Sequence, residues 1–82
     1  MEKTKIFLVD DKQVYRNAIK ILLNKIGDAK IVGEAASGEE FLKKIDNAPK
    51  PDVVFMDIEM PGLDGIETTR KALARHPDLS VI

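Results

Sequence analysis

The sequence predicts an α/β fold with a parallel sheet, and three observations lead to this class. Short apolar runs alternate with segments in which apolar residues recur every three or four positions, as strands and helices do in α/β proteins. Two of the apolar runs, residues 6–9 and 53–56, end at acidic residues. A helical segment separates each run from the next, which favours parallel strands joined by right-handed crossovers.

The length and composition are typical of one small globular domain, which spans residues 1–82. Apolar residues make up 44% and charged residues 33% of the chain, and the net charge is -1. No basic excess would attract nucleic acid or an anionic membrane surface, and without cysteine the chain offers neither a disulfide nor a thiolate metal site. The charged start precedes only four apolar residues, too few for a signal peptide or a membrane span. We therefore expect a cytoplasmic protein with no membrane partner.

The first strand–helix unit is predicted from residue 6 to residue 26. Residues 6–9 are apolar and rich in strand formers, and Asp10 and Asp11 follow them directly. Residues 12–26 are predicted to form a helix that ends at Gly27, a residue that suits a left-handed C-terminal cap. The helix is expected to bury one apolar stripe, which consists of Val14, Ala18, Ile21, Leu22 and Ile26.

The second unit is a more polar strand followed by a short helix. Residues 30–35 predict an edge strand. Ser37 and Glu40 have the spacing of a capping box, in which both side chains satisfy backbone amides at a helix start. The helix that follows is expected to bury Phe41, Leu42 and Ile45, and the proline-containing segment 47–51 ends it.

The third unit contains the central strand. Residues 53–56 are predicted to form a parallel strand covered on both faces, with Asp57 at its carboxyl end. A loop then leads to a helix over residues 66–75, for which Asp64 is the expected N-cap. His76 is expected at the surface, near the C-terminal end of the helix dipole. Residues 80–82 begin another apolar run, the predicted start of a fourth strand.

Three acids are expected to meet at one edge of the sheet. If the first and third strands are neighbours about 5 Å apart, Asp10, Asp11 and Asp57 lie within a few ångströms of each other. Clustered carboxylates repel, and a divalent cation with a preference for oxygen ligands, such as Mg²⁺, relieves that repulsion. Such a site would also suit a carboxylate that attacks a phosphoryl group to form an acyl phosphate. A simpler alternative for Asp11 alone is that it caps the first helix.

These motifs resemble the receiver domain of two-component response regulators. The resemblance covers all 82 residues and rests on segments 6–11 and 53–65 and on the spacing between them. It implies a flavodoxin-like, CheY-like sheet of strand order 2-1-3-4. It also implies that Asp57 accepts a phosphoryl group from a sensor histidine kinase, and that Asp10, Asp11, Asp57 and the backbone carbonyl of Glu59 hold Mg²⁺.

A softer resemblance concerns the output of the protein. Segments 32–35 and 65–70 are similar to receivers that precede helix-turn-helix DNA-binding domains of the LuxR/NarL type. This implies control of transcription, although no DNA-binding domain lies within the 82 residues, so no direct contact with nucleic acid is expected from them.

The chain ends inside the fourth strand of the receiver pattern, so it corresponds to the N-terminal two-thirds of that domain. The fifth strand and the last two helices are absent, together with the Ser or Thr and the Lys that the family places after strands four and five. Because bare apolar strand faces are unstable in water, we expect the chain not to persist as an ordinary monomer. A homodimer, an element-swapped dimer or completion by another polypeptide would each cover them, and so would the rest of a longer chain of which these residues are a remnant.

Two other functions compete with a phosphoacceptor. A phosphohydrolase of the haloacid-dehalogenase type also places a nucleophilic Asp after an apolar strand, but it needs a second Asp two residues later. Lys12 and Glu59 stand at those positions after Asp10 and Asp57. The other alternative is a pairing module that acts without phosphorylation.

Overall fold

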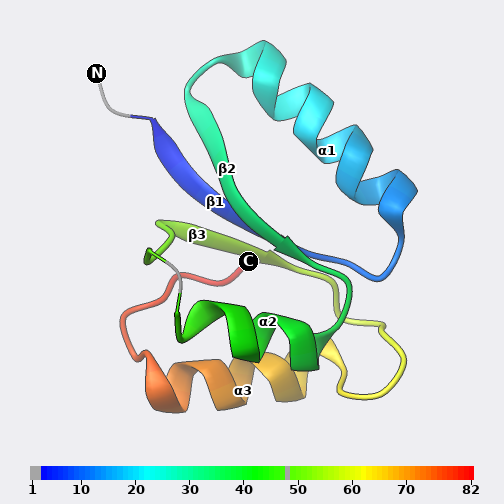
Figure 1. Ribbon diagram of the computed structural model, residues 1–82, viewed down its shortest axis with the longest axis vertical. Coiled ribbons are helices and arrows are strands. Elements are labelled where there is room, and N and C mark those ends of the chain that lie inside the picture. The colour runs from blue at the N-terminus through cyan, green and yellow to red at the C-terminus, as the bar shows by residue number, and fades with distance from the viewer. Residues whose placement is uncertain (1–2, 48) are drawn as a thin grey trace.

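The computed structural model describes residues 3–47 and 49–82. They form a parallel sheet of order β2-β1-β3, with α1 on one face and α2 and α3 on the other (Figure 1). Within the described residues, no helix is long and apolar enough to cross a membrane. The elements in chain order are β1 (Thr4–Val9), α1 (Gln13–Ile26), β2 (Ala29–Ala35), α2 (Gly38–Ile45), β3 (Val53–Met56) and α3 (Gly65–Arg75).

The predicted class and strand order are confirmed, and the outer side of β3 shows how a fourth strand begins. Val81 forms a parallel bridge with Val54. The Val54 N–H donates to the Ser80 carbonyl at 2.8 Å, and the Ile82 N–H donates to the Val54 carbonyl at 2.9 Å. The chain therefore reaches the position of strand four with its first backbone hydrogen bonds already made.

The main core lies between the sheet and the α2–α3 layer. β1 is the central strand, and its residues 6–9 are all buried because neighbours pair with it on both sides. Phe7 packs edge-on against Phe41 of α2, with ring centroids 5.1 Å apart. The buried core residues are Phe7, Val9, Ala35, Phe41, Leu42, Ile45, Val54, Met60, Ala72 and Leu79. The expected apolar face of α2 is thus confirmed.

The helix ends follow the predicted caps. Ser37 Oγ accepts from the Glu40 N–H at 3.0 Å, as in a capping box, whereas the Glu40 carboxylate accepts the N–H of Ala36, one residue before the N-cap, at 2.8 Å. Asp64 caps α3 by accepting the Glu67 N–H at 2.9 Å. Gly27 ends α1 in the left-handed conformation, with a φ of 85°.

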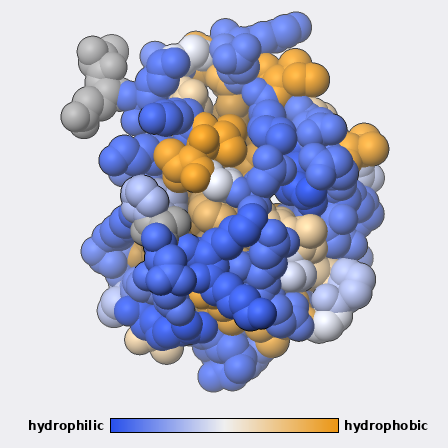
Figure 2. All heavy atoms as spheres, in the orientation of Figure 1, coloured by the Kyte–Doolittle hydropathy of each residue, from blue (hydrophilic) through white to orange (hydrophobic). Residues whose placement is uncertain are grey.

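The expected buried stripe of α1 is wrong. Val14, Ile21, Leu22 and Ile26 are 59–73% exposed, and Ala18 is exposed as well. Apolar groups accordingly reach the surface over the α1 half of the molecule in Figure 2. The helix instead turns half-buried Ile19 and Leu23, together with buried Arg16, inward. α1 therefore carries two adjacent apolar strips: the predicted, exposed one and the one with Ile19 and Leu23 that meets β2. Helical periodicity alone favours the first because it contains more apolar residues.

The expectation that β3 is covered on both faces is also wrong. Val54 points into the α2–α3 core and is fully buried, whereas Val53, Phe55 and Met56 are only half-buried. α1 packs against β2 and leaves the β3 half of that sheet face partly open. His76 lies at the C-terminal end of α3, as expected, where its Nε2 is 2.9 Å from an oxygen of Asp46.

Candidate functional site

Three carboxylates meet at the carboxyl edge of the sheet, as the sequence predicts. Asp10 and Asp11 follow β1, and Asp57 follows β3, the strand beside it. One oxygen from each of the three side chains lies within 4.8 Å of the other two. Each of these acids is half-buried, so the cluster remains open to solvent and to an incoming ion.

The sheet itself positions the backbone of these acids. The Asp57 N–H donates to the Val9 carbonyl at 2.9 Å, and the Asp10 N–H donates to the Ala35 carbonyl at 3.1 Å. Asp57 is therefore registered against β1, and Asp10 is registered against β2. Because successive parallel strands carry these bonds, the spacing between the acids follows from strand spacing rather than from a flexible loop.

Lys12 is the immediate neighbour of the cluster and begins α1. Its backbone N–H donates to Asp10 Oδ1 at 2.9 Å, and its ammonium donates to Asp11 Oδ1 at 3.2 Å. The N-cap of α1 is Lys12, and its side chain makes no capping hydrogen bond. The alternative in which Asp11 caps the helix is thus wrong. The carboxylate of Asp10, not that of Asp11, accepts the backbone N–H of Lys12 at the start of α1, and the Asp11 side chain belongs to the acid cluster.

The acids create a negative potential that is felt by Lys12. Its hydrogen bond to Asp11 raises the pKa of the Lys12 ammonium, and the charges of Asp11, Asp57 and Asp10 raise that pKa further. The ammonium also lies 5.5 Å from the centre of the Tyr15 ring. A cluster that stabilises a monovalent cation in this way attracts a divalent cation more strongly.

The donor set fits Mg²⁺. Its clustered ligands are carboxylate oxygens, and half-exposed acids leave room for the several water molecules that Mg²⁺ retains in proteins. Glu59 lies two residues beyond Asp57 and is exposed, and its carboxylate is not part of the described cluster. The role of its backbone carbonyl as a ligand stays a prediction.

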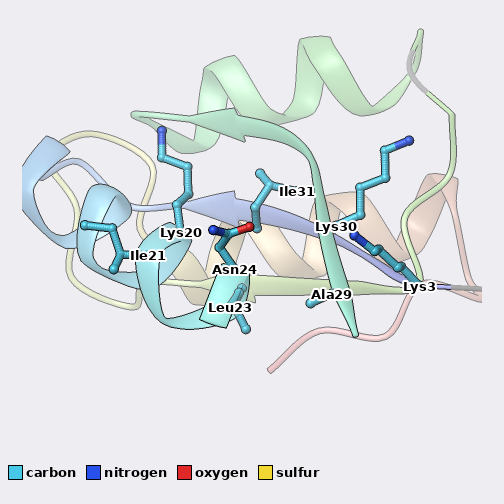
Figure 3. Close-up of a pocket in the computed structure, with 8 residues that line it drawn as sticks. All are labelled: Lys3, Lys20, Ile21, Leu23, Asn24, Ala29, Lys30 and Ile31. Atoms are coloured by element: carbon cyan, nitrogen blue, oxygen red, sulfur yellow. The ribbon is translucent and has the colours of Figure 1, made fainter. Parts of the chain in front are cut away.

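A groove of about 290 Å³ runs beside the acids, between α1 and the open half of β3. Its lining includes the apolar residues Leu8, Ile19 and Phe55 and the acids Asp10 and Asp57. A larger pocket, of about 450 Å³, lies at the opposite end of the sheet, where Lys3, Lys20 and Lys30 border apolar side chains (Figure 3). The acid cluster therefore borders the smaller of these two pockets, and pocket size does not point to it.

Two residues near the site escaped sequence reasoning. Arg16 donates to the Asp10 carbonyl from inside α1, and Gly65 packs against the Asp57 carbonyl. Arg16 left no signal, because the apolar periodicity of the helix places it off the predicted buried stripe, and only packing against β2 turns it inward. The close approach of Gly65 depends on tertiary structure and leaves no signal either.

The sequence model of the response regulator receiver domain matches residues 6–82. Response regulator GacA of Pseudomonas syringae pv. syringae (strain B728a) is 49% identical over 78 residues, which cover 95% of this chain and 36% of that protein. Transcriptional regulatory protein DegU of Brevibacillus brevis is 34% identical over 80 residues, which cover 98% of this chain and 34% of that protein. The chain thus spans about a third of the length of these curated relatives.

Solved structures give the same result. The response regulator protein TrrA from Thermotoga maritima, in complex with Mg²⁺-BeF, superimposes with a TM-score of 0.85 at 35% identity, over 95% of this chain and 65% of that one. The response regulator domain of Thermotoga maritima CheB superimposes with a TM-score of 0.85 at 36% identity, over 98% of this chain and 58% of that one.

Proposed function

Because this chain belongs to the response regulator receiver family, we propose that Asp57 accepts a phosphoryl group from the phosphohistidine of a sensor histidine kinase. The observation that carries the proposal is the meeting of Asp10, Asp11 and Asp57 within 4.8 Å at the carboxyl ends of adjacent strands. One of these carboxylates attacks, and the other two supply charge for a cation.

Asp57 suits the role of nucleophile because its backbone is held on β1 while its side chain stands at the edge of the sheet. An Asp57 carboxylate oxygen attacks phosphorus and forms an acyl phosphate. The phosphorus–nitrogen bond of the donor breaks, and its electron pair leaves with the imidazole. Such a transfer needs positioning and charge stabilisation more than it needs covalent assistance from the protein.

Asp10 and Asp11, with Asp57 and the backbone carbonyl of Glu59, are the residues that would hold Mg²⁺. The ion supplies neutralisation of the phosphoryl oxygens when it is bound. To hold the ion, Asp11 would give up the hydrogen bond that it now accepts from the Lys12 ammonium, and Lys12 would remain nearby as a second positive group.

We further propose the setting in which this chemistry acts. The chain is a cytoplasmic phosphoacceptor that assists its own phosphorylation without turning over a substrate, and it normally controls a transcriptional output domain. The relatives that are named as response and transcriptional regulators support this assignment.

The test is the intact mass of the protein before and after incubation with acetyl phosphate and Mg²⁺. We expect a gain of one phosphoryl unit that Asp57→Asn abolishes and that Asp28→Asn, an exposed acid outside the cluster, leaves unchanged. No gain in the wild-type protein contradicts the proposal. Turnover of p-nitrophenyl phosphate would instead support a phosphohydrolase.

The uncovered face of α1 favours a second candidate function, which is self-association. Large apolar residues stand symmetrically about Ala18: Val14 and Leu22 lie four positions away, and Tyr15 and Ile21 lie three positions away. These four are each more than half exposed. Two copies of α1 that cross in antiparallel orientation at Ala18 would therefore bury matching side chains across a two-fold axis.

Sedimentation equilibrium tests the pairing. We expect concentration-dependent dimers that Ala18→Glu disrupts, because it places a charge at the crossing point. Asn24→Glu is the control, since Asn24 is an exposed residue on another side of the same helix. A wild-type monomer at high concentration would overturn the pairing but not the phosphoacceptor role.

A further inference from the structure

Arg16 is a buried charge in a helix that otherwise turns charge outward. It is the one buried residue of α1, all of which the structure describes, and its side chain is 9% exposed. Its Nε donates to Glu34 Oε1 on β2 at 2.8 Å, and its two other nitrogens donate to the Asp10 carbonyl and to Gln13 Oε1. Every nitrogen of the guanidinium therefore has a partner, and the partners lie on three different segments.

The carbonyl that Arg16 holds belongs to the peptide bond between Asp10 and Asp11. Because a peptide unit is planar, fixing its oxygen restricts the last backbone rotation of Asp10 and the first of Asp11. The N–H of Asp10 is fixed as well, by its hydrogen bond to the Ala35 carbonyl at 3.1 Å. The two acids that follow β1 are thus oriented from both sides of the Asp10 residue.

Glu34 anchors the guanidinium and compensates its charge. One Glu34 oxygen accepts from Arg16, and the other accepts from Lys20 at 2.8 Å. These two hydrogen bonds, first that of Lys20 and then that of Arg16, lower the pKa of the Glu34 carboxyl. Glu34 and Ala35 are adjacent on β2, so one strand reaches Asp10 by two routes, directly and through Arg16.

We propose that Arg16, anchored by Glu34, is a positioning residue that sets the orientation of Asp10 and Asp11 for Mg²⁺. This inference rests on the proposed function for its purpose, but its test measures the ion directly. Outer partners of metal ligands commonly change metal affinity by about 10–100-fold when they are removed. Arg16 would act through the peptide plane and touch neither the ion nor the phosphoryl group.

A purely structural role for Arg16, as a tie between α1 and β2, predicts a different result. Lys20 supplies the matched control, since it lies on the same helix and binds the same carboxylate but has no hydrogen bond to Asp10. If Arg16 only linked α1 to β2, Lys20→Gln and a substitution of Arg16 would weaken that link, and any effect on Mg²⁺ affinity, to a similar extent. A positioning role singles out Arg16.

The experiment compares Arg16→Lys with Lys20→Gln in the full chain, with Mg²⁺ affinity measured by isothermal titration calorimetry. Lysine keeps the charge but cannot span three partners as a planar guanidinium does. We expect Arg16→Lys to raise the dissociation constant about tenfold, and Lys20→Gln to change it less than about twofold. Phosphorylation by acetyl phosphate should then recover to the wild-type rate at saturating Mg²⁺.

Each outcome separates this inference from the proposed function. Equal effects of the two variants, or no effect of Arg16→Lys, overturn the positioning role alone. Intact Mg²⁺ binding without phosphorylation of the wild-type protein overturns the phosphoacceptor proposal alone, and a wild-type chain that binds no Mg²⁺ overturns both. If circular dichroism shows that Arg16→Lys does not fold, Glu34→Gln takes its place. Glu34→Gln should also raise the dissociation constant for Mg²⁺. An unchanged dissociation constant would contradict the inference.

Discussion

Gly65 lies directly against the backbone carbonyl of Asp57. A Cβ built on Gly65 would stand 2.0 Å from the Asp57 oxygen and 2.7 Å from the Cα of Ile58. The Gly65 N–H also donates to the Ile58 carbonyl at 2.8 Å, so the first turn of α3 is fastened to the loop after β3. The start of α3 thereby helps to determine where Asp57 stands, and only glycine allows this approach.

Gly65→Ala is expected to displace the Asp57 loop. The added methyl group meets backbone atoms that have little freedom to move, so we expect a loss of about 2 kcal/mol in the free energy of unfolding. Phosphorylation of Asp57 should slow in the same variant. Urea denaturation and acetyl phosphate labelling measure the two effects. Gly27→Ala strains a left-handed turn far from the site and should lower stability without slowing phosphorylation.

Mg²⁺ is expected to stabilise the folded protein through the three acids. A ligand present at 100 times its dissociation constant adds about 2.7 kcal/mol to the free energy of unfolding. The midpoint temperature of thermal unfolding should therefore rise when Mg²⁺ is added and return to its starting value when EDTA removes the ion. Asp11→Asn should reduce the shift, whereas Asp28→Asn, outside the cluster, should preserve it. An equal shift in both variants would place the ion elsewhere.

Loss of the α2 capping box is expected to destabilise the α2–α3 layer. Ser37→Ala leaves the Glu40 N–H without its side-chain acceptor, and removal of an N-cap hydroxyl costs about 1 kcal/mol. Chemical denaturation measures the change. Ser80→Ala alters an exposed serine outside the helices and should have little effect. Equal losses in the two variants would rule out the capping explanation.

A buried residue of β1 and an exposed apolar residue of α1 should respond differently to truncation. Leu8 is 1% exposed, so Leu8→Ala should cost about 3 kcal/mol through lost burial and a cavity. Ile21 is 59% exposed, so Ile21→Ala should change stability by less than about 0.5 kcal/mol. Both variants are measured by urea denaturation at low protein concentration, where pairing is absent. A large loss from Ile21→Ala would mean that the predicted stripe is buried after all.

Acid should weaken the link between α1 and β2. The partners of Glu34 hold its folded-state pKa below the usual value, first Lys20 and then Arg16. The unfolded chain therefore binds the proton more readily, and the Glu34 contribution is present above the unfolded pKa and lost as pH falls through the folded one. We expect the free energy of unfolding to fall below about pH 4.5, and to fall less steeply in Glu34→Gln. Parallel pH profiles for the two proteins would contradict this.

The sequence alone carried the strand–helix order and the identity of the candidate site acids. Strands 6–9 and 53–56 can be predicted because runs of β-branched and aromatic residues end at acids. The caps at Ser37 and Asp64 can be predicted because a cap is a hydrogen bond between residues close in sequence. The meeting of Asp10 and Asp57 follows from one further premise, that the two strands are neighbours, which the structure confirms.

Only the tertiary structure decided which surfaces are covered and what holds the acids in place. Periodicity found the apolar stripe of α1, but the face that meets β2 is chosen by the fit of Ile19, Leu23 and Arg16. The bond from Arg16 to the Asp10 carbonyl and the approach of Gly65 to Asp57 each join a helix to the residue that follows a strand, so both depend on how that helix packs against the sheet. Local sequence patterns record the geometry of one element, whereas these contacts depend on how the elements pack together.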